Sequence, residues 1–163
     1  MSKFILKVAV CSFLTFISIH SSGQDSTRQD SLYNQLFYQN SNRYCFSCGN
    51  FGIDSDNLRQ FSELIAGRRF DLVEKLLHSE LPSTQYFAAE IILFVNKKKF
   101  WQSDDSIFSR IEQLRTSEER VGFESGCVMM GNSYSIESLL AQKKDVPYYK
   151  FIRSWIKRKF KYY

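Results

Sequence analysis

Histidine is scarce in this sequence, and its scarcity limits the chemistry that the chain can perform. The two histidines are His20 and His78, and His20 lies in an N-terminal segment that we expect to be removed. A Ser-His-Asp or Cys-His catalytic device needs a histidine as its general base. We interpret His78, which ends an apolar helical pattern, as a surface or capping residue. The sequence therefore argues against hydrolases of this type.

The common loops that bind phosphate, calcium or haem are also missing. No glycine-rich phosphate loop of either common kind occurs. Asp54 and Asp56 start an acidic pattern, but no glycine stands at the sixth position that a calcium loop requires. A haem-attachment motif has histidine directly after its second cysteine, where this chain has Gly49. We therefore expect no catalytic residue, no metal site and no cofactor.

No apolar run is long enough to cross a bilayer, which takes about 20 residues. The longest candidate spans residues 8–19 and follows two lysines. A positive start, a short apolar run and small residues at Ser21 and Gly23 are typical of a cleaved signal peptide. We predict a signal peptide over residues 1–23, cleaved near Gly23, and an exported protein that is periplasmic or extracellular.

Apolar residues recur at helical spacing through most of the remaining chain, which predicts an all-α fold. Residues 24–57 are predicted to form a leader helix and a cysteine-containing loop, and residues 58–163 a helical domain with a basic C-terminal helix. We expect one domain overall, either a small helical bundle or a short helical array. Residues 121–132 contain three glycines and are predicted to be a loop with at most a short extended piece. The apolar groups that predict helices are Leu32–Phe37, Leu58–Ile65, Phe70–Leu77, Tyr86–Val95, Ile107–Leu114, Ile136–Leu140 and Tyr148–Lys161.

Polar residues that favour helix N-termini precede several of these groups. Ser83 or Thr84 is a predicted cap for the apolar helix over residues 86–95. Ser103 or Asp104 is predicted to cap the next helix, and Ser135 the short one after it.

Residues 70–95, FDLVEKLLHSELPSTQYFAAEIILFV, carry the most specific helical pattern. A helix ending in two leucines is followed by a short Ser/Pro turn and by a helix with Ala88 and Ala89. This stretch resembles the joint between HEAT-type helical repeats, and the resemblance implies that the small alanines let two helices approach closely. The layout as a whole resembles small exported bacterial proteins, a likeness that implies no activity.

Three cysteines remain after export, Cys45, Cys48 and Cys127. Disulfides persist outside the cytoplasm, and a bridge from Cys45 or Cys48 to Cys127 would close a loop of roughly 80 residues and contribute about 4 kcal/mol. We favour this structural interpretation. A thioredoxin-like CxxC remains an alternative, although GNFGIDSDN follows the pair where that motif needs a helix start. A Cys₃His zinc site with His78 is a further alternative, although it lacks the usual two close ligand pairs.

The C-terminal segment carries the basic charge. Residues 143–161 hold eight Lys and Arg side chains and one acid, Asp145. Five of these basic residues fall on one arc of the predicted helix, and the predicted apolar arc contains Phe151, Ile152, Trp155 and Ile156. They are candidates for binding a surface: Lys150, Arg153, Lys157, Arg158 and Lys161. The helix either docks its aromatic face on the core, leaving the basic face in solvent, or lies on an anionic membrane surface.

These observations favour an exported, non-catalytic helical protein that binds another protein or the cell envelope. The expected partner is an envelope or secreted protein, with peripheral contact to an anionic membrane surface as a further possibility. Nucleic acid is not an expected partner of an exported protein. The alternative function is thiol-disulfide activity through Cys45 and Cys48. The sequence leaves the oligomeric state open.

The exported protein should begin at Gln24 and contain one reducible bridge. We expect an intact mass that corresponds to residues 24–163, with one thiol open to alkylation before reduction and three after it. A non-reducing digest should contain a peptide that joins Cys127 to Cys45 or Cys48. A bridge between Cys45 and Cys48 with Cys127 free would instead favour the redox alternative.

Overall fold

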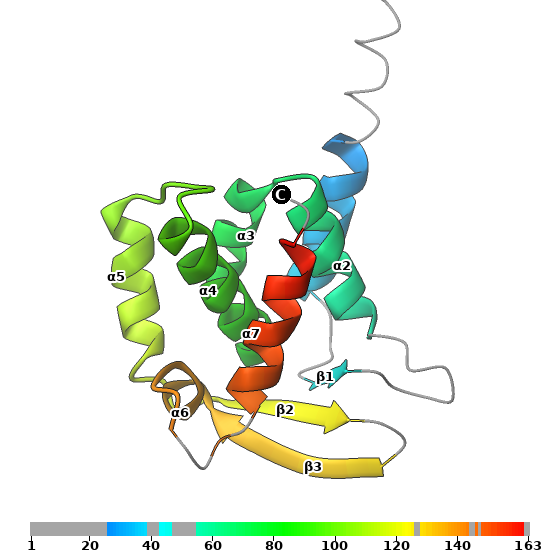
Figure 1. The fold of residues 1–163 in the computed structure, drawn as a ribbon, viewed down its shortest axis with the longest axis vertical. Coiled ribbons are helices and arrows are strands. Elements are labelled where there is room, and N and C mark those ends of the chain that lie inside the picture. Colours follow the sequence, from blue (N-terminus) through cyan, green and yellow to red (C-terminus); the bar gives the residue numbers. More distant parts are fainter. Residues whose placement is uncertain are drawn as a thin grey trace, which may run out of the picture.

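The structure is a computed structural model that describes residues 26–38, 43–46, 55–125, 128–143, 146 and 148–161. The described residues are mostly helical, which confirms the predicted fold class (Figure 1). The first described helix covers residues 26–38. The later elements are β1 (Arg43–Phe46), α2 (Asp56–Ala66), α3 (Phe70–Lys75), the 3₁₀ helix η1 (Leu76–His78), α4 (Pro82–Lys97), α5 (Asp105–Leu114), β2 (Arg120–Ser125), β3 (Val128–Ser135), α6 (Ile136–Leu140) and α7 (Tyr148–Lys159). The predicted signal peptide lies outside the described residues.

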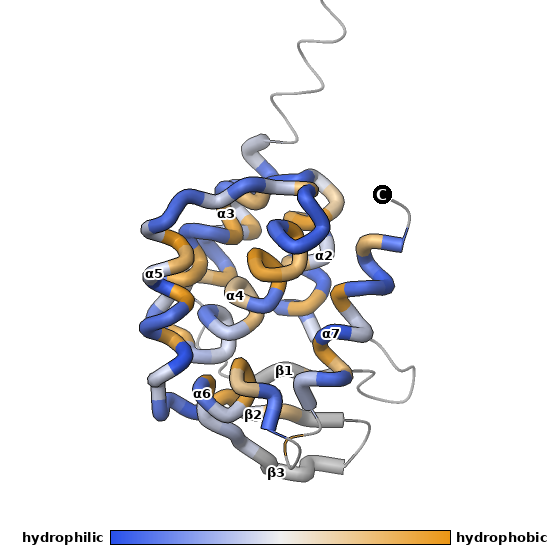
Figure 2. The backbone as a smooth tube through the Cα atoms, turned by 60° about the vertical axis from the view of Figure 1, so that its left-hand side comes forward, coloured by the Kyte–Doolittle hydropathy of each residue, from blue (hydrophilic) through white to orange (hydrophobic). Residues whose placement is uncertain are grey.

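Helix α4 is the centre of the fold. Every side chain over residues 83–92 is buried, so this helix is covered on all its faces for more than two turns. Figure 2 shows α4 with orange, hydrophobic segments and the other helices around it. Pro82 occupies the first helical turn, where its missing N–H costs no helical hydrogen bond. The predicted caps Ser83 and Thr84 are therefore not caps, because the helix begins before them.

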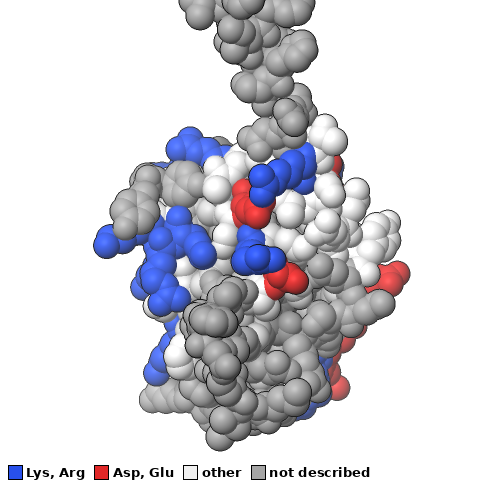
Figure 3. Space-filling model, turned by 90° about the vertical axis from the view of Figure 1, so that its right-hand side faces the viewer, with Lys and Arg blue, Asp and Glu red and all other residues white. Residues whose placement is uncertain are grey.

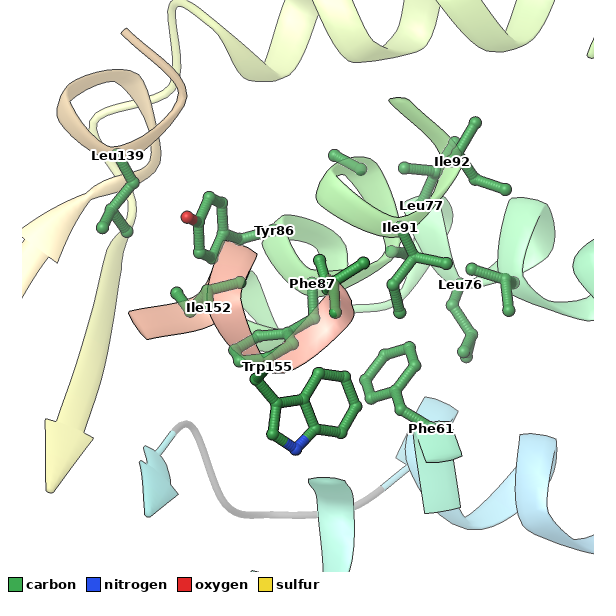
Figure 4. Close-up of a cluster of buried hydrophobic side chains, with 14 of the residues drawn as sticks. Phe61, Leu76, Leu77, Tyr86, Phe87, Ile91, Ile92, Leu139, Ile152 and Trp155 are labelled. Carbon is green, nitrogen blue, oxygen red and sulfur yellow. The ribbon is translucent and has the colours of Figure 1, made fainter. Parts of the chain in front are cut away.

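Aromatic rings of α2, α4 and α7 meet in the core. The Phe87 ring lies 5.8 Å from the Phe61 ring of α2 in a stacked arrangement. On its other side Phe87 meets the Trp155 ring of α7 edge to face, with the ring centroids 6.2 Å apart. Figure 4 shows these rings together with Leu76 and Ile91. Edge-to-face and offset stacked pairs are the favourable geometries for aromatic rings, so this contact fixes α7 against α2 and α4.

Polar contacts attach the first helix to the start of α4. The Ser79 hydroxyl donates to the Phe37 carbonyl oxygen at 3.2 Å, and the Thr84 hydroxyl donates to the Leu36 carbonyl oxygen at 3.4 Å. Carbonyl groups in the last turn of a helix have no helical partner and need such donors when buried. Leu36 itself is fully buried in the core.

Two predicted caps are present in the structure. The Asp104 carboxylate accepts from the backbone N–H groups of Ser106 and Ile107 and starts α5. The Ser135 hydroxyl accepts from the Ser138 N–H and starts α6. Ser103 does not cap α5. Its hydroxyl and N–H instead bond the Asn96 side chain at the end of α4.

A three-stranded sheet lies across one end of the helices (Figure 1), in the order β1-β2-β3. Strand β1 is parallel to β2 and pairs Arg43 with Gly122, whereas β3 is antiparallel to β2. The predicted cysteine-containing loop therefore includes a strand, β1, and residues 121–132, predicted as a loop with a short extended piece, instead belong largely to β2 and β3. Val121 and Phe123 alternate inward with Gly122 between them, a signal too short to stand out among glycines.

Helix α7 docks on the core with its apolar side. Ile152, Trp155 and Ile156 are buried, as predicted, and Tyr148 stacks on Phe123 of β2 with the ring centroids 4.8 Å apart. The prediction was wrong for Phe151, which was placed on the apolar arc but is 57% exposed. The helix begins against the sheet and continues along α4, so its outward side is determined by these two contacts.

Replacing Phe87 by alanine should destabilise the fold by about 3–5 kcal/mol, because the ring is fully buried among other rings. The matched control is Phe151→Ala, for which a change within about 0.5 kcal/mol is expected at an exposed position. Urea unfolding followed by circular dichroism measures both values. Similar losses for the two variants would contradict the packing described for α4 and α7.

Candidate functional site

The basic residues predicted from sequence divide into two groups. Lys150, Lys157, Arg158 and Lys161 are exposed and form what we call the basic face of α7. Arg153 is half-buried and contacts a carboxylate of the core. Figure 3 shows Lys and Arg side chains gathered along the left-hand edge of the molecule. Lys159, which lies off the predicted arc, sits over the Trp155 ring at 5.1 Å from its centroid.

The partner of Arg153 is Glu90, a buried acid in the middle of α4. Its residue surface is only 3% exposed. The Arg153 Nε donates to Glu90 Oε2 at 3.2 Å, which joins α7 to α4 by an ion pair. Burying a carboxylate is costly unless a charge of opposite sign and hydrogen bonds compensate for it. The sequence offers one signal of this residue, a single acid inside the apolar run AAEIILFV.

The surroundings of Glu90 raise its pKa above the ordinary value for glutamate. Burial raises the pKa of Glu90, and the charge and hydrogen bond of Arg153, followed by the charge of Arg115, oppose that rise. Burial, and then the charge of Glu90, raise the pKa of Tyr86 well above its usual range. The Tyr86 side chain lies beside Glu90, and the interaction between the two groups lowers the pKa of Glu90 and raises that of Tyr86.

A groove of about 330 Å³ lies between α4 and α7 and reaches Glu90. Four cationic side chains and one carboxylate line it, together with three apolar residues. The lining residues are Glu90, Leu93, Phe94, Lys97, Lys98, Arg153, Ile156 and Lys157. The groove therefore combines a positive rim with an apolar wall, and Arg153 and Glu90 pair with each other where it meets α4.

A second hollow, of about 460 Å³, lies beside the first helix and α2. Its two charged lining residues, Arg28 and Glu63, already pair with each other at 2.7 Å. This hollow therefore offers no unmatched charge, and we take the groove between α4 and α7 as the candidate site.

Cys45 lies in strand β1, where it is 7% exposed. Its sulfur is disulfide-bonded, and no second cysteine is present among the described residues, because Cys48 and Cys127 lie outside them. The register of β1 places Cys45 opposite Glu124, three positions before Cys127 in the sequence. The pairing of the three cysteines stays a prediction.

Neither alternative for the cysteines gains a specific observation. A reactive CxxC needs its first cysteine at a helix N-terminus, whereas Cys45 is in a strand and the next described helix, α2, begins at Asp56. His78 is an exposed residue at the end of η1. Within the described part of the chain, no three His, Cys, Asp or Glu side chains are grouped so that they could hold a metal ion.

The chain matches no protein-family profile, no curated protein and no solved structure. The resemblance of residues 70–95 to HEAT-type repeats therefore stays a prediction. Among the described helices, none has the length and apolar character needed to span a bilayer.

The raised pKa of Glu90 predicts how its contribution to stability depends on pH. A carboxyl group with a higher pKa in the folded than in the unfolded protein stabilises the fold below its unfolded pKa, and this contribution is lost as the pH rises through the folded value. We expect the wild-type protein to gain stability relative to Glu90→Gln as the pH falls from 7 toward the ordinary glutamate value of 4.5. Urea unfolding at several pH values measures the difference.

The exposed Glu80 provides a matched control for that measurement, as Glu80→Gln removes a carboxylate from solvent. If acidification instead destabilises the wild-type protein more than it destabilises Glu90→Gln, the environment described for Glu90 is contradicted.

Proposed function

We propose that this protein is an exported, non-catalytic helical protein that binds the anionic membrane surface of the cell envelope through the basic face of α7. The observation that carries the proposal is the division of α7 into two sides. Ile152, Trp155 and Ile156 are buried in the core, and the opposite side presents the basic face with Phe151 exposed beside it. The helix contains no acidic residue.

The end of α4 extends this positive surface. Lys97, Lys98 and Lys99 are exposed, and Lys97 and Lys98 line the same groove as Lys157 of α7. The next residue, Phe100, is 44% exposed and stacks on the Phe160 ring that follows α7, with the ring centroids 5.7 Å apart. The two ends therefore form one surface that combines lysines with exposed aromatic rings.

Such a combination is what peripheral membrane contact requires. Each Lys or Arg near an anionic bilayer contributes about 1 kcal/mol of attraction, and exposed aromatic rings add apolar insertion at the headgroup level. An acidic protein surface would attract the same cations, and protein interfaces are also rich in aromatic residues. We favour lipid as the partner because the lysines and the exposed rings lie on one surface and α7 has no acidic residue to oppose an anionic bilayer.

Reversing two charges of the basic face should weaken vesicle binding. We expect Lys157→Glu combined with Arg158→Glu to reduce affinity for anionic vesicles by about 30-fold or more, because two attractive charges are lost. Co-sedimentation with vesicles of phosphatidylcholine with and without phosphatidylglycerol measures this effect. Wild-type binding should also fall as salt rises, since salt screens exposed charges.

The matched control combines Lys75→Glu with Lys143→Glu, which changes the net charge equally on α3 and after α6. Both residues are exposed, and the pair of Lys143 with Glu137 is a surface ion pair of small energetic value. Equal loss in both double variants would show a general charge effect and contradict the role of α7. If the wild-type protein does not bind anionic vesicles, the membrane proposal is contradicted and an acidic protein becomes the favoured partner.

A further inference from the structure

We propose that the end of the molecule opposite the sheet is a membrane-inserting tip, from which the Phe100 ring enters the headgroup region of an anionic bilayer. The tip consists of residues 97–100 at the end of α4 and residues 157–161 at the end of α7. The inference rests on the proposed membrane function and adds an orientation to it. Helices α4 and α7 meet the bilayer end-on, and the sheet faces away from it.

Helices α4 and α7 run in the same direction, so their C-terminal ends lie together. Near the two helix starts, the rings of Tyr86 and Tyr148 both contact the Phe123 ring of β2, with centroid distances of 6.5 and 4.8 Å. Near the two helix ends, the Phe94 ring lies 5.1 Å from the Phe160 ring. Figure 1 shows the sheet at one end of the molecule and the end of α7 at the other.

Positive charge gathers at the tip. The basic residues are Lys97, Lys98 and Lys99 at the end of α4 and Lys157, Arg158, Lys159 and Lys161 at the end of α7. Two exposed acids, Asp104 and Asp105, follow the tip along the chain, and the Asp104 carboxylate already accepts from two N–H groups of α5. Cations at helix C-termini also complement the helix dipoles, so the aromatic ring among them is the observation that points to a bilayer.

Phe100 is held in place among these charges by a tight turn. Lys99 has a left-handed backbone, with a φ of 59°. Its N–H donates to the Asn96 carbonyl oxygen at 3.0 Å, and the Phe100 N–H donates to that of Val95 at 2.9 Å, a common way to end a helix. The Phe100 ring stacks on Phe160 and is still 44% exposed. Because this ring is supported from the core and surrounded by lysines, it can enter the headgroup region without any movement of the helices.

The first test compares two exposed aromatic residues at opposite ends of the molecule. Tyr38 is 73% exposed at the end of the first helix, whose last turn bonds the start of α4. We expect Phe100→Ala to weaken binding to vesicles of phosphatidylcholine and phosphatidylglycerol about tenfold, because the exposed part of the ring no longer leaves water. Tyr38→Ala should bind as the wild-type protein does.

The outcomes of this co-sedimentation experiment separate the two proposals. Equal losses in both variants, or no loss in Phe100→Ala while the wild-type protein binds these vesicles, overturn the tip and leave the proposed function standing. A wild-type protein that does not bind the vesicles overturns both.

The second test measures the orientation directly. Phe151 is 57% exposed in the first turn of α7, at the sheet end of that helix. Lipids brominated in the upper part of their acyl chains quench a tryptophan that enters the bilayer. We expect them to quench Phe100→Trp more strongly than Phe151→Trp, after subtraction of the wild-type signal of Trp101 and Trp155. Equal quenching would mean that α7 lies flat on the bilayer, and it overturns the end-on orientation, as does stronger quenching of Phe151→Trp.

The variant Phe100→Trp also protects the first test against a packing defect. Alanine at this position removes the stacking partner of Phe160 and could loosen the end of α7. Tryptophan keeps an aromatic ring there, and tryptophan is enriched where proteins meet the membrane interface. We therefore expect Phe100→Trp to bind the vesicles at least as tightly as the wild-type protein. An affinity as low as that of Phe100→Ala overturns the insertion of this ring.

Discussion

Because α4 is buried on all its faces for more than two turns, each neighbouring element is positioned by the part of α4 that it covers. Helices α2 and α7 approach it through Phe61 and Trp155, and η1 supplies Leu76 and Leu77. A polar group on such a helix has little access to bulk water and needs a partner on an adjacent element. Glu90 is such a group, and its partner is Arg153 on α7, the helix that covers this part of α4.

The helices were predictable because their signal is local. Apolar residues at helical spacing identify α2, α4, α5 and α7 within a few residues, and Asp104 and Ser135 mark two helix starts through short-range capping bonds. The sheet was not predictable in the same way. Strand β1 has four residues, and its pairing with β2 joins positions far apart in the sequence. Glycines in and around β2 and β3 favour a loop interpretation, and nothing local indicates that Val121 and Phe123 share a buried face.

The candidate site was predictable in part. The basic face of α7 follows from a concentration of Lys and Arg on one arc of a terminal helix, which is visible in the sequence. The interaction of Arg153 with Glu90 is not visible there, because it depends on which side of α4 faces α7. One acid in an apolar run is compatible with a solvent-facing position, and only the packing of the two helices shows that it is buried. The exposure of Phe151 was missed for the same reason.

The parallel pairing of β1 with β2 also bears on the order in which the chain can fold. Contacts among α2, α3, η1 and α4 join neighbouring segments, whereas Arg43 has to find Gly122 after all four of these elements. Closing long loops costs chain entropy before any contact compensates for it, so non-local strand pairs slow folding. In a chain synthesised from its N-terminus, β1 is complete long before its partner exists. The contacts among α2, α3, η1 and α4 can therefore form first. The edge of β1 stays unpaired until the last third of the protein, which contains β2, has been synthesised.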